Sequence, residues 1–111
     1  MQLVIDGDLY KIAKITGPTH NMLGLSFFQE NETGQLNIDD LEIKKSSHNT
    51  LNKNNIIEIV TSTIEEFNSE FKVNLRIKTI QFLSSDTPII NCYKELTTQI
   101  ALKFINSKHY K

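Results

Sequence analysis

The chain is poor in the residues that usually mark covalent, metal or membrane chemistry. Among its 111 residues there are one cysteine, two prolines, four glycines and no tryptophan. A single cysteine, Cys92, excludes an intrachain disulfide and a zinc site built from several cysteines. No apolar run approaches the roughly 18 residues that a membrane-spanning helix needs. The opening residues lack a basic segment and include Asp6 and Asp8, so we expect a cytoplasmic protein with no membrane partner.

Arginine is equally scarce, because Arg76 is the only arginine among twelve basic residues. Proteins that bind nucleic acids favour arginine, whose planar fork makes paired contacts with phosphates and bases. The spacings GxGxxG, HxH, HxxxH and CxxC and the P-loop pattern are absent as well. We therefore expect no nucleic-acid partner, no metal and no cofactor.

Apolar and charged residues are present in the proportions of a soluble globular protein, 39% and 23%. The length suits one domain with one hydrophobic core. No linker or internal repeat divides the chain, so we predict a single domain over residues 1–111.

The first half reads as short strands separated by turns. Gly7, between two aspartates, predicts a tight hairpin turn, and the sequence NETG at 31–34 predicts another. Alternating or continuous apolar runs predict strands at 3–5, 9–15, 22–28, 35–38 and 41–45. Consecutive short strands of this kind form an antiparallel meander of about four or five strands.

The second half contains two helical patterns. Asn55 is a candidate N-cap, and Glu58 can reach back to it as in a capping box. The first apolar stripe consists of Ile57, Val60, Ile64, Phe67 and Phe71. Thr87 and Pro88 are suited to begin the second helix. Its predicted buried face consists of Ile89, Tyr93, Leu96, Ile100 and Phe104.

Between the two helices lies one more strand pattern. Val73, Leu75 and Ile77 alternate, and the alternation slips before Ile80 and Phe82, which predicts a β-bulge. The fold class that follows is α+β: an N-terminal β-meander, then helix, strand and helix. The tail at 107–111 is expected to fray.

The stretch ITGPTHNMLGLSF at 15–27 permits two interpretations. It is a turn between strands, with Pro18 fixing the backbone and His20 and Asn21 tolerating left-handed geometry. Alternatively, His20 is a general base, which would need a second histidine, His48 or His109, and a lysine. The alternative function is thus a small metal-independent enzyme with RNase-like acid–base chemistry.

Two other residues have structural interpretations. Gly24, inside a predicted strand, marks a bulge or a close backbone approach. Cys92 lies beside the apolar face of the second helix, where a small buried thiol packs as a hydrophobic residue. No nucleophile elbow surrounds Ser26.

Acidic residues gather in the first part of the chain. Residues 1–70 carry eleven acids and five lysines. The segment 30–42 contains Glu30, Glu32, Asp39, Asp40 and Glu42 and no basic residue. The first helix adds Glu58, Glu65, Glu66 and Glu70. Such carboxylates either form a solvated face or dock on a basic partner, whose approach they would accelerate.

In size, acidic front half and α+β organisation, the chain resembles the small immunity proteins of bacterial polymorphic and contact-dependent toxin systems. The stretches ENETGQLNIDDLE (30–42) and IIEIVTSTIEEFNSEF (56–71) carry this resemblance. It implies a cytoplasmic protein that binds one cognate toxin, often a nuclease, and covers its active site without catalysis.

The resulting prediction is a non-catalytic, protein-binding inhibitor whose partner is a toxin with a basic surface. The predicted partner-binding residues are Glu30, Glu32, Asp39, Asp40, Glu42, Glu58, Glu65 and Glu66. Two alternatives stay open: the His20 enzyme, and a homo-oligomer joined through an exposed strand edge of the meander.

Overall fold

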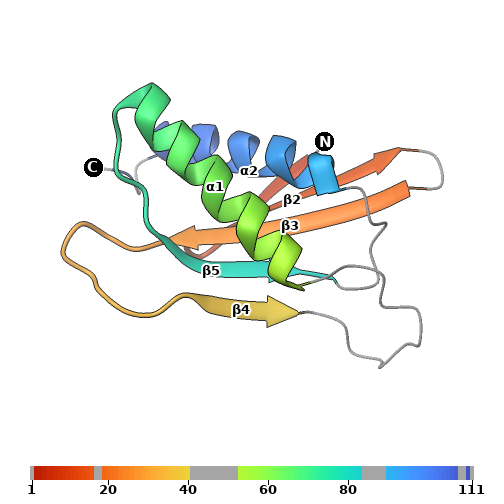
Figure 1. The fold of residues 1–111 in the computed structure, drawn as a ribbon, viewed down its shortest axis with the longest axis horizontal. Helices are drawn as coiled ribbons and strands as arrows, with labels where there is room; N and C mark the ends of the chain where they lie inside the picture. The colour runs from red at the N-terminus through yellow and green to blue at the C-terminus, as the bar shows by residue number, and fades with distance from the viewer. Residues whose placement is uncertain (1, 17–18, 41–52, 84–89, 108–109, 111) are drawn as a thin grey trace.

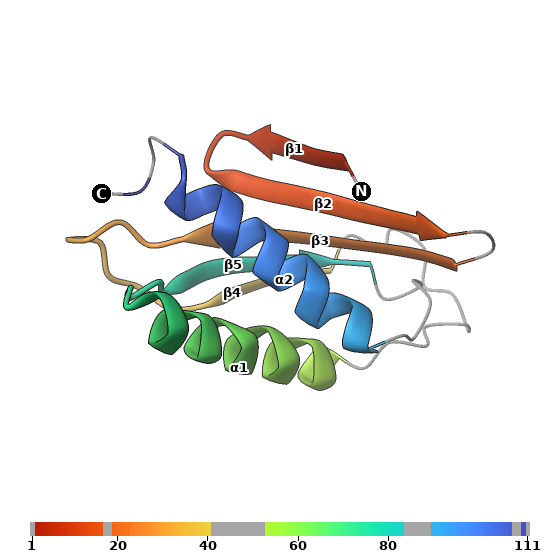
Figure 2. The ribbon, with the colours of Figure 1, turned by 90° about the horizontal axis from the view of Figure 1, so that it is seen from above.

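A five-stranded sheet carries two helices on one of its faces (Figures 1 and 2). The computed structural model describes residues 2–16, 19–40, 53–83, 90–107 and 110. Its elements are β1 (Gln2–Asp6), β2 (Leu9–Thr16), β3 (Thr19–Phe27), β4 (Asn37–Asp40), α1 (Lys53–Phe71), β5 (Ile77–Phe82) and α2 (Ile90–Ile105). The predicted α+β class and the order of strands, helix, strand and helix are confirmed.

The order of strands in the sheet is β1-β2-β3-β5-β4. Three strands, β1 to β3, form the predicted antiparallel meander. The strand at 37–40 does not extend it, because β5 pairs with β3 and β4 pairs with β5 in parallel. Parallel neighbours need a long crossover connection, and α1 lies in the connection between β4 and β5.

The predicted hairpin turn between β1 and β2 is present, and it has two residues. Asp6 pairs with Leu9 across Gly7 and Asp8. Gly7 has a φ of 64°, and Lys72 is the one described non-glycine residue with a positive φ. A left-handed first position followed by an ordinary second one is the pattern of a type II′ turn, which matches the twist of a hairpin.

Most of the stretch 15–27 belongs to the strands β2 and β3, and Pro18, predicted to fix the turn, lies outside the described residues. Thr16 pairs with Thr19, so β3 begins three residues before the predicted residue 22. His20 and Asn21 pair with Ile15 and Lys14 inside the ladder. The left-handed geometry predicted for these two residues is therefore wrong.

The close contacts at residue 24 come from neighbouring side chains and not from the closely approaching backbone that was predicted. A Cβ atom at Gly24 would lie 3.3 Å from the Gln81 Cβ and 3.3 Å from the Lys11 Cγ. The ladder is regular at this position, so Gly24 accommodates neighbouring side chains and does not form a bulge.

The bulge predicted in the last strand is present. Ser26 pairs with Thr79 and Phe27 pairs with Ile77, so the register shifts by one residue around Lys78. The strand itself begins only at Ile77, whereas the alternating residues 73–76 form the connection that leaves α1.

The helix α1 begins two residues before the predicted N-cap Asn55. Its buried side chains are Ile56, Val60, Thr63, Ile64 and Phe67. Phe71, which the stripe placed in the core, is 42% exposed and stacks on Phe67 with 4.4 Å between ring centroids. Asn68 joins the helix to the connection, since its Nδ2 donates to Leu75 O at 3.0 Å and its Oδ1 accepts from Leu75 N at 2.9 Å.

The helix α2 crosses β2 and β3, and α1 lies beside it toward β4 (Figure 2). Tyr93, Leu96, Ile100 and Phe104 are buried as predicted. Thr87, Pro88 and Ile89 lie outside the described residues. Cys92 is buried in the core, as its predicted packing role requires.

The two described residues of the predicted tail, Ser107 and Tyr110, have contacts with the rest of the protein. Ser107 Oγ accepts a 2.8 Å hydrogen bond from the Tyr10 hydroxyl on β2. Tyr110 packs edge-on against Phe104, with 5.9 Å between ring centroids. Neither described helix has the length and hydropathy that crossing a membrane requires.

Candidate partner-binding surface

The acidic residues predicted to bind a partner fall into two groups, those with an intramolecular partner and those without. Glu32 belongs to the first group, because its Oε2 lies 2.9 Å from the Lys78 Nζ and its Oε1 accepts from the backbone N–H of Gln29 at 3.0 Å. Asp8, in the β1–β2 turn, lies 3.6 Å from the same Lys78 Nζ. One lysine in the β5 bulge thus gathers carboxylates from two separate segments.

The hydrogen bonds and charges within this cluster shift the pKa values of Glu32 and Lys78. The backbone hydrogen bond from Gln29 and the bond to Lys78 lower the pKa of Glu32 from its ordinary value. The hydrogen bond and the charge of Glu32 raise the pKa of Lys78, with a smaller contribution from Asp8. Both shifts favour the charged forms, so the cluster stays ionised at neutral pH.

Two other predicted residues also have partners. Asp39, on β4, accepts a 2.9 Å hydrogen bond from Gln81 Nε2 on the neighbouring β5. Among the described residues, the Oε1 atom of Gln81 is buried without a hydrogen-bond partner and lies near Gly24. Glu66 lies 3.4 Å from the Lys94 Nζ on α2. These carboxylates hold elements of the protein together.

Glu30, Glu58 and Glu65 make up the second group. Within the described part of the chain, their carboxylates take part in no hydrogen bond or ion pair. Glu58 and Glu65 are seven residues apart, two turns of α1, and both point away from the buried side of the helix. Asp40, exposed at the end of β4, does not belong to this second group, and Glu42 lies outside the described residues.

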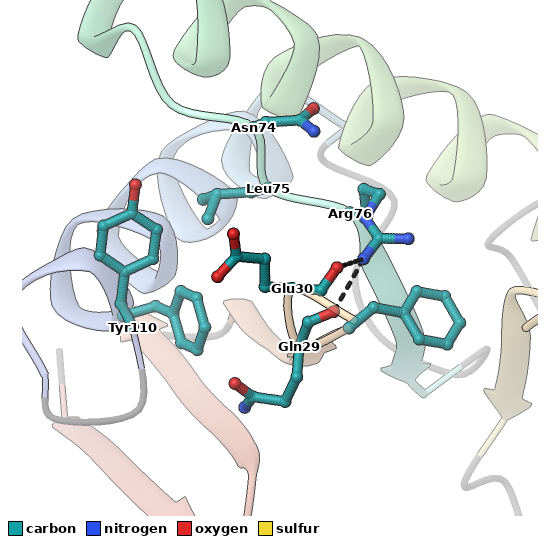
Figure 3. Close-up of a pocket in the computed structure, with 8 residues that line it drawn as sticks. Gln29, Glu30, Asn74, Leu75, Arg76 and Tyr110 are labelled. Atoms are coloured by element: carbon teal, nitrogen blue, oxygen red, sulfur yellow. Dashed lines mark hydrogen bonds between the residues drawn. The ribbon is translucent and has the colours of Figure 1, made fainter. Parts of the chain in front are cut away.

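Glu30 borders a pocket of about 460 Å³. Figure 3 shows its carboxylate pointing toward the space between Leu75 and Tyr110. The remaining walls come from Phe28, Gln29, Asn74, Arg76 and Phe104. A carboxylate beside aromatic rings is suited to a cationic side chain, which gains both an ion pair and a ring contact.

The only arginine of the chain is used to build this pocket. Arg76 donates from one guanidinium nitrogen to Gln29 O at 2.7 Å and to Glu30 O at 3.3 Å (Figure 3). Its guanidinium carbon lies 5.6 Å from the centre of the Phe28 ring. These contacts fix the turn that presents Glu30. In the sequence, Arg76 is distinguished only as the single arginine. That observation does not show which groups its side chain binds.

The histidines of the alternative enzyme are not brought together by any described contact. His20 lies on β3 opposite Ile15, while His48 and His109 lie outside the described residues. Among the residues that the structure describes, no three His, Cys, Asp or Glu side chains gather as metal ligands. The predicted pairing of His20 with a second histidine stays a prediction.

Comparisons with protein-family models, curated proteins and solved structures found no match for this chain.

Proposed function

We propose that this protein is a non-catalytic inhibitor that binds a basic protein partner through α1 and the adjoining end of the sheet. The observation that carries the proposal is the group of three exposed carboxylates, Glu30, Glu58 and Glu65, which have no partner among the described residues. Carboxylates already held by Lys78, Gln81 or Lys94 would have to break a contact before they bind another molecule.

The partner class suggested by this surface is a toxin with a cationic active site, as in the resemblance to immunity proteins of bacterial toxin systems. Such a site binds a negatively charged substrate, and fixed carboxylates can occupy it in the substrate's place. Complementary charge would also speed association. In that role the protein would act in the cytoplasm and would need no cofactor.

The first test identifies the partner. A tagged copy is used to capture proteins from the source bacterium, and bound species are identified by mass spectrometry. The proposal expects one stoichiometric protein that is toxic when expressed alone and harmless when expressed together with this chain. A captured protein that is equally toxic in both cases would contradict an inhibitory role.

The second test asks which carboxylates touch the partner. Reversing charge singly with Glu30→Lys, Glu58→Lys or Glu65→Lys should cost about 2 kcal/mol or more, roughly 30-fold in Kd, wherever the carboxylate is paired centrally. Asp6→Lys is the matched control for charge reversal, because it lies on β1, remote from α1. Equal affinities for all four variants would remove this surface from the interface.

The dissociation rate adds a further distinction. Loss of a direct contact mainly raises the dissociation rate, whereas loss of long-range attraction mainly lowers the association rate and its salt dependence. If the proposal is correct, replacing at least one of the three glutamates should mainly raise the dissociation rate.

A further inference from the structure

The outer edge of β1 is unpaired among the described residues and is apolar at its centre. β1 is a terminal strand of the sheet, with only β2 beside it (Figure 2). Val4 is 51% exposed and Ile5 is 44% exposed, two of the four large apolar side chains that are exposed in the described part. An open edge with apolar side chains is a template for another strand.

The turn that follows β1 determines which backbone groups face outward. In a two-residue hairpin the closing pair, here Asp6 with Leu9, is a hydrogen-bonded pair. Hydrogen-bonded pairs alternate along an antiparallel ladder, so Val4 also bonds to β2. The N–H and C=O groups of Leu3 and Ile5 therefore point away from the sheet.

The outward backbone groups of β1 are complementary to those of a second, antiparallel copy of β1. If a second copy of β1 runs antiparallel with Val4 opposite Val4, then Leu3 of each copy lies opposite Ile5 of the other. The outward N–H and C=O groups of these two residues then form two hydrogen-bonded pairs, with a non-hydrogen-bonded pair at the centre.

The side chains agree with this register. Leu3 and Ile5 share the helix-covered face, and Val4 lies on the opposite face, so apolar residues meet apolar residues on both sides. Asp6 lies opposite the uncharged Gln2 of the second copy and not opposite another aspartate. A shift of one residue would misplace the outward backbone groups. A shift of two would place Asp6 opposite Val4 in one direction and Gln2 opposite Val4 in the other.

We propose that two copies of this chain associate through their β1 strands, antiparallel and centred on Val4, to form a continuous ten-stranded sheet. The two-fold arrangement closes after two copies, whereas pairing of β1 with the β4 edge of another copy would continue indefinitely. A contact limited to five-residue strands is smaller than a standard interface, so the dimer is weak and depends on concentration. This inference does not rest on the proposed function.

Disulfide trapping tests the register directly. Cα atoms of a central non-hydrogen-bonded pair are about 4.5 Å apart, within the range that a disulfide spans. Val4→Cys should therefore cross-link rapidly under mild oxidation. Asp6→Cys is the matched control on the same edge, where the two copies would place their sulfurs roughly 14 Å apart along the strands. Cys92 is buried in both variants.

Sedimentation velocity provides the second measurement, over about 10 μM to 1 mM protein, where so small an interface would associate. The unmodified chain should shift from monomer to dimer. Val4→Glu should stay monomeric, because two carboxylates would face each other, while the register places the new carboxylate opposite Lys11 within its own chain. An equimolar mixture of Val4→Glu and Val4→Lys should recover the dimer.

Each possible result either supports or overturns the proposed dimer. Faster cross-linking of Val4→Cys, with a dimer that Val4→Glu abolishes and the mixture restores, supports the proposal. A monomer throughout the concentration range overturns it. So does a dimer that survives Val4→Glu, equal cross-linking of the two cysteine variants, or a mixture that stays monomeric. Thermal unfolding of both charged variants checks that the monomer remains folded.

Discussion

The two edges of the sheet differ in their neighbours, their polarity and their connections. β1 is held by one tight turn to β2 and exposes Val4 and Ile5. β4 has four residues, ends in Asp39 and Asp40, and pairs in parallel with β5. The difference shows that one sheet can carry an edge open to pairing and an edge protected by charge and short length.

The largest loss of stability is expected in β5, the strand that pairs with β4. Ile80 is fully buried in β5, opposite Leu25 on one side and Ile38 of β4 on the other. Ile80→Ala should lower the free energy of unfolding by about 2–5 kcal/mol, because it removes buried methyl groups and leaves a cavity. Urea denaturation measures the change. A loss below about 1 kcal/mol would show that β5 is not the centre of the core.

A smaller loss is expected where α1 joins β5. Asn68→Ala removes both hydrogen bonds to the backbone of Leu75, a residue that is 6% exposed. The cost should be about 1–3 kcal/mol, because buried backbone groups are left unpaired. Ser69→Ala, on the exposed side of the same helix, is the control and should change little. Equal denaturation midpoints for the two variants would contradict the bridging role of Asn68.

The contribution of Glu32 should depend on pH. Its pKa in the folded protein is lowered, so its contacts stabilise the protein above the ordinary glutamate pKa of about 4.3 and are lost as the pH falls through the folded value. Glu32→Gln should therefore be less stable than the unmodified chain at pH 7, and the two should converge in acid. Glu58→Gln, which loses no contact, should show no such convergence. Parallel stability curves for Glu32→Gln and the unmodified chain would contradict the effect.

The smallest change is expected at the open edge. Val4→Ala should alter the unfolding free energy of the dilute monomer by no more than about 0.5 kcal/mol, because Val4 is half exposed. At high concentration the difference should grow, because association stabilises only the folded chain. A large loss in dilute solution would show that β1 is packed as tightly as β5.

Local patterns predicted most of the elements. Alternation, the two-residue turn at Gly7 and the apolar stripe that includes Val60, Ile64 and Phe67 are properties of short segments, and they place four strands and both helices within a few residues. The partner of β4 was not predictable, because a four-residue strand with a single apolar residue, Ile38, fits either side of a sheet. The predicted break before 41–45 was wrong at Asp39 and Asp40, which lie inside β4; the residues from 41 lie outside the described part.

The candidate surface was predictable only as a set of charges. Sequence shows that Glu30, Glu32 and Glu66 are acidic, but not that Lys78 and Lys94 are close enough to bind two of them. Those distances depend on the β5 bulge and on the packing of α1 beside α2. Which carboxylates remain without a partner can be decided only after the contacts of the other acidic residues have been located in the structure.

The position of β5 has a consequence for synthesis of the chain. The ribosome completes the meander and β4 well before it reaches residues 77–82, yet these residues form the strand between β3 and β4. Until then the outer edge of β3 has no neighbour and β4 has nothing to pair with. The nascent chain therefore carries an incomplete sheet until residues 77–82 have been synthesised, and we expect the sheet to form only after that point.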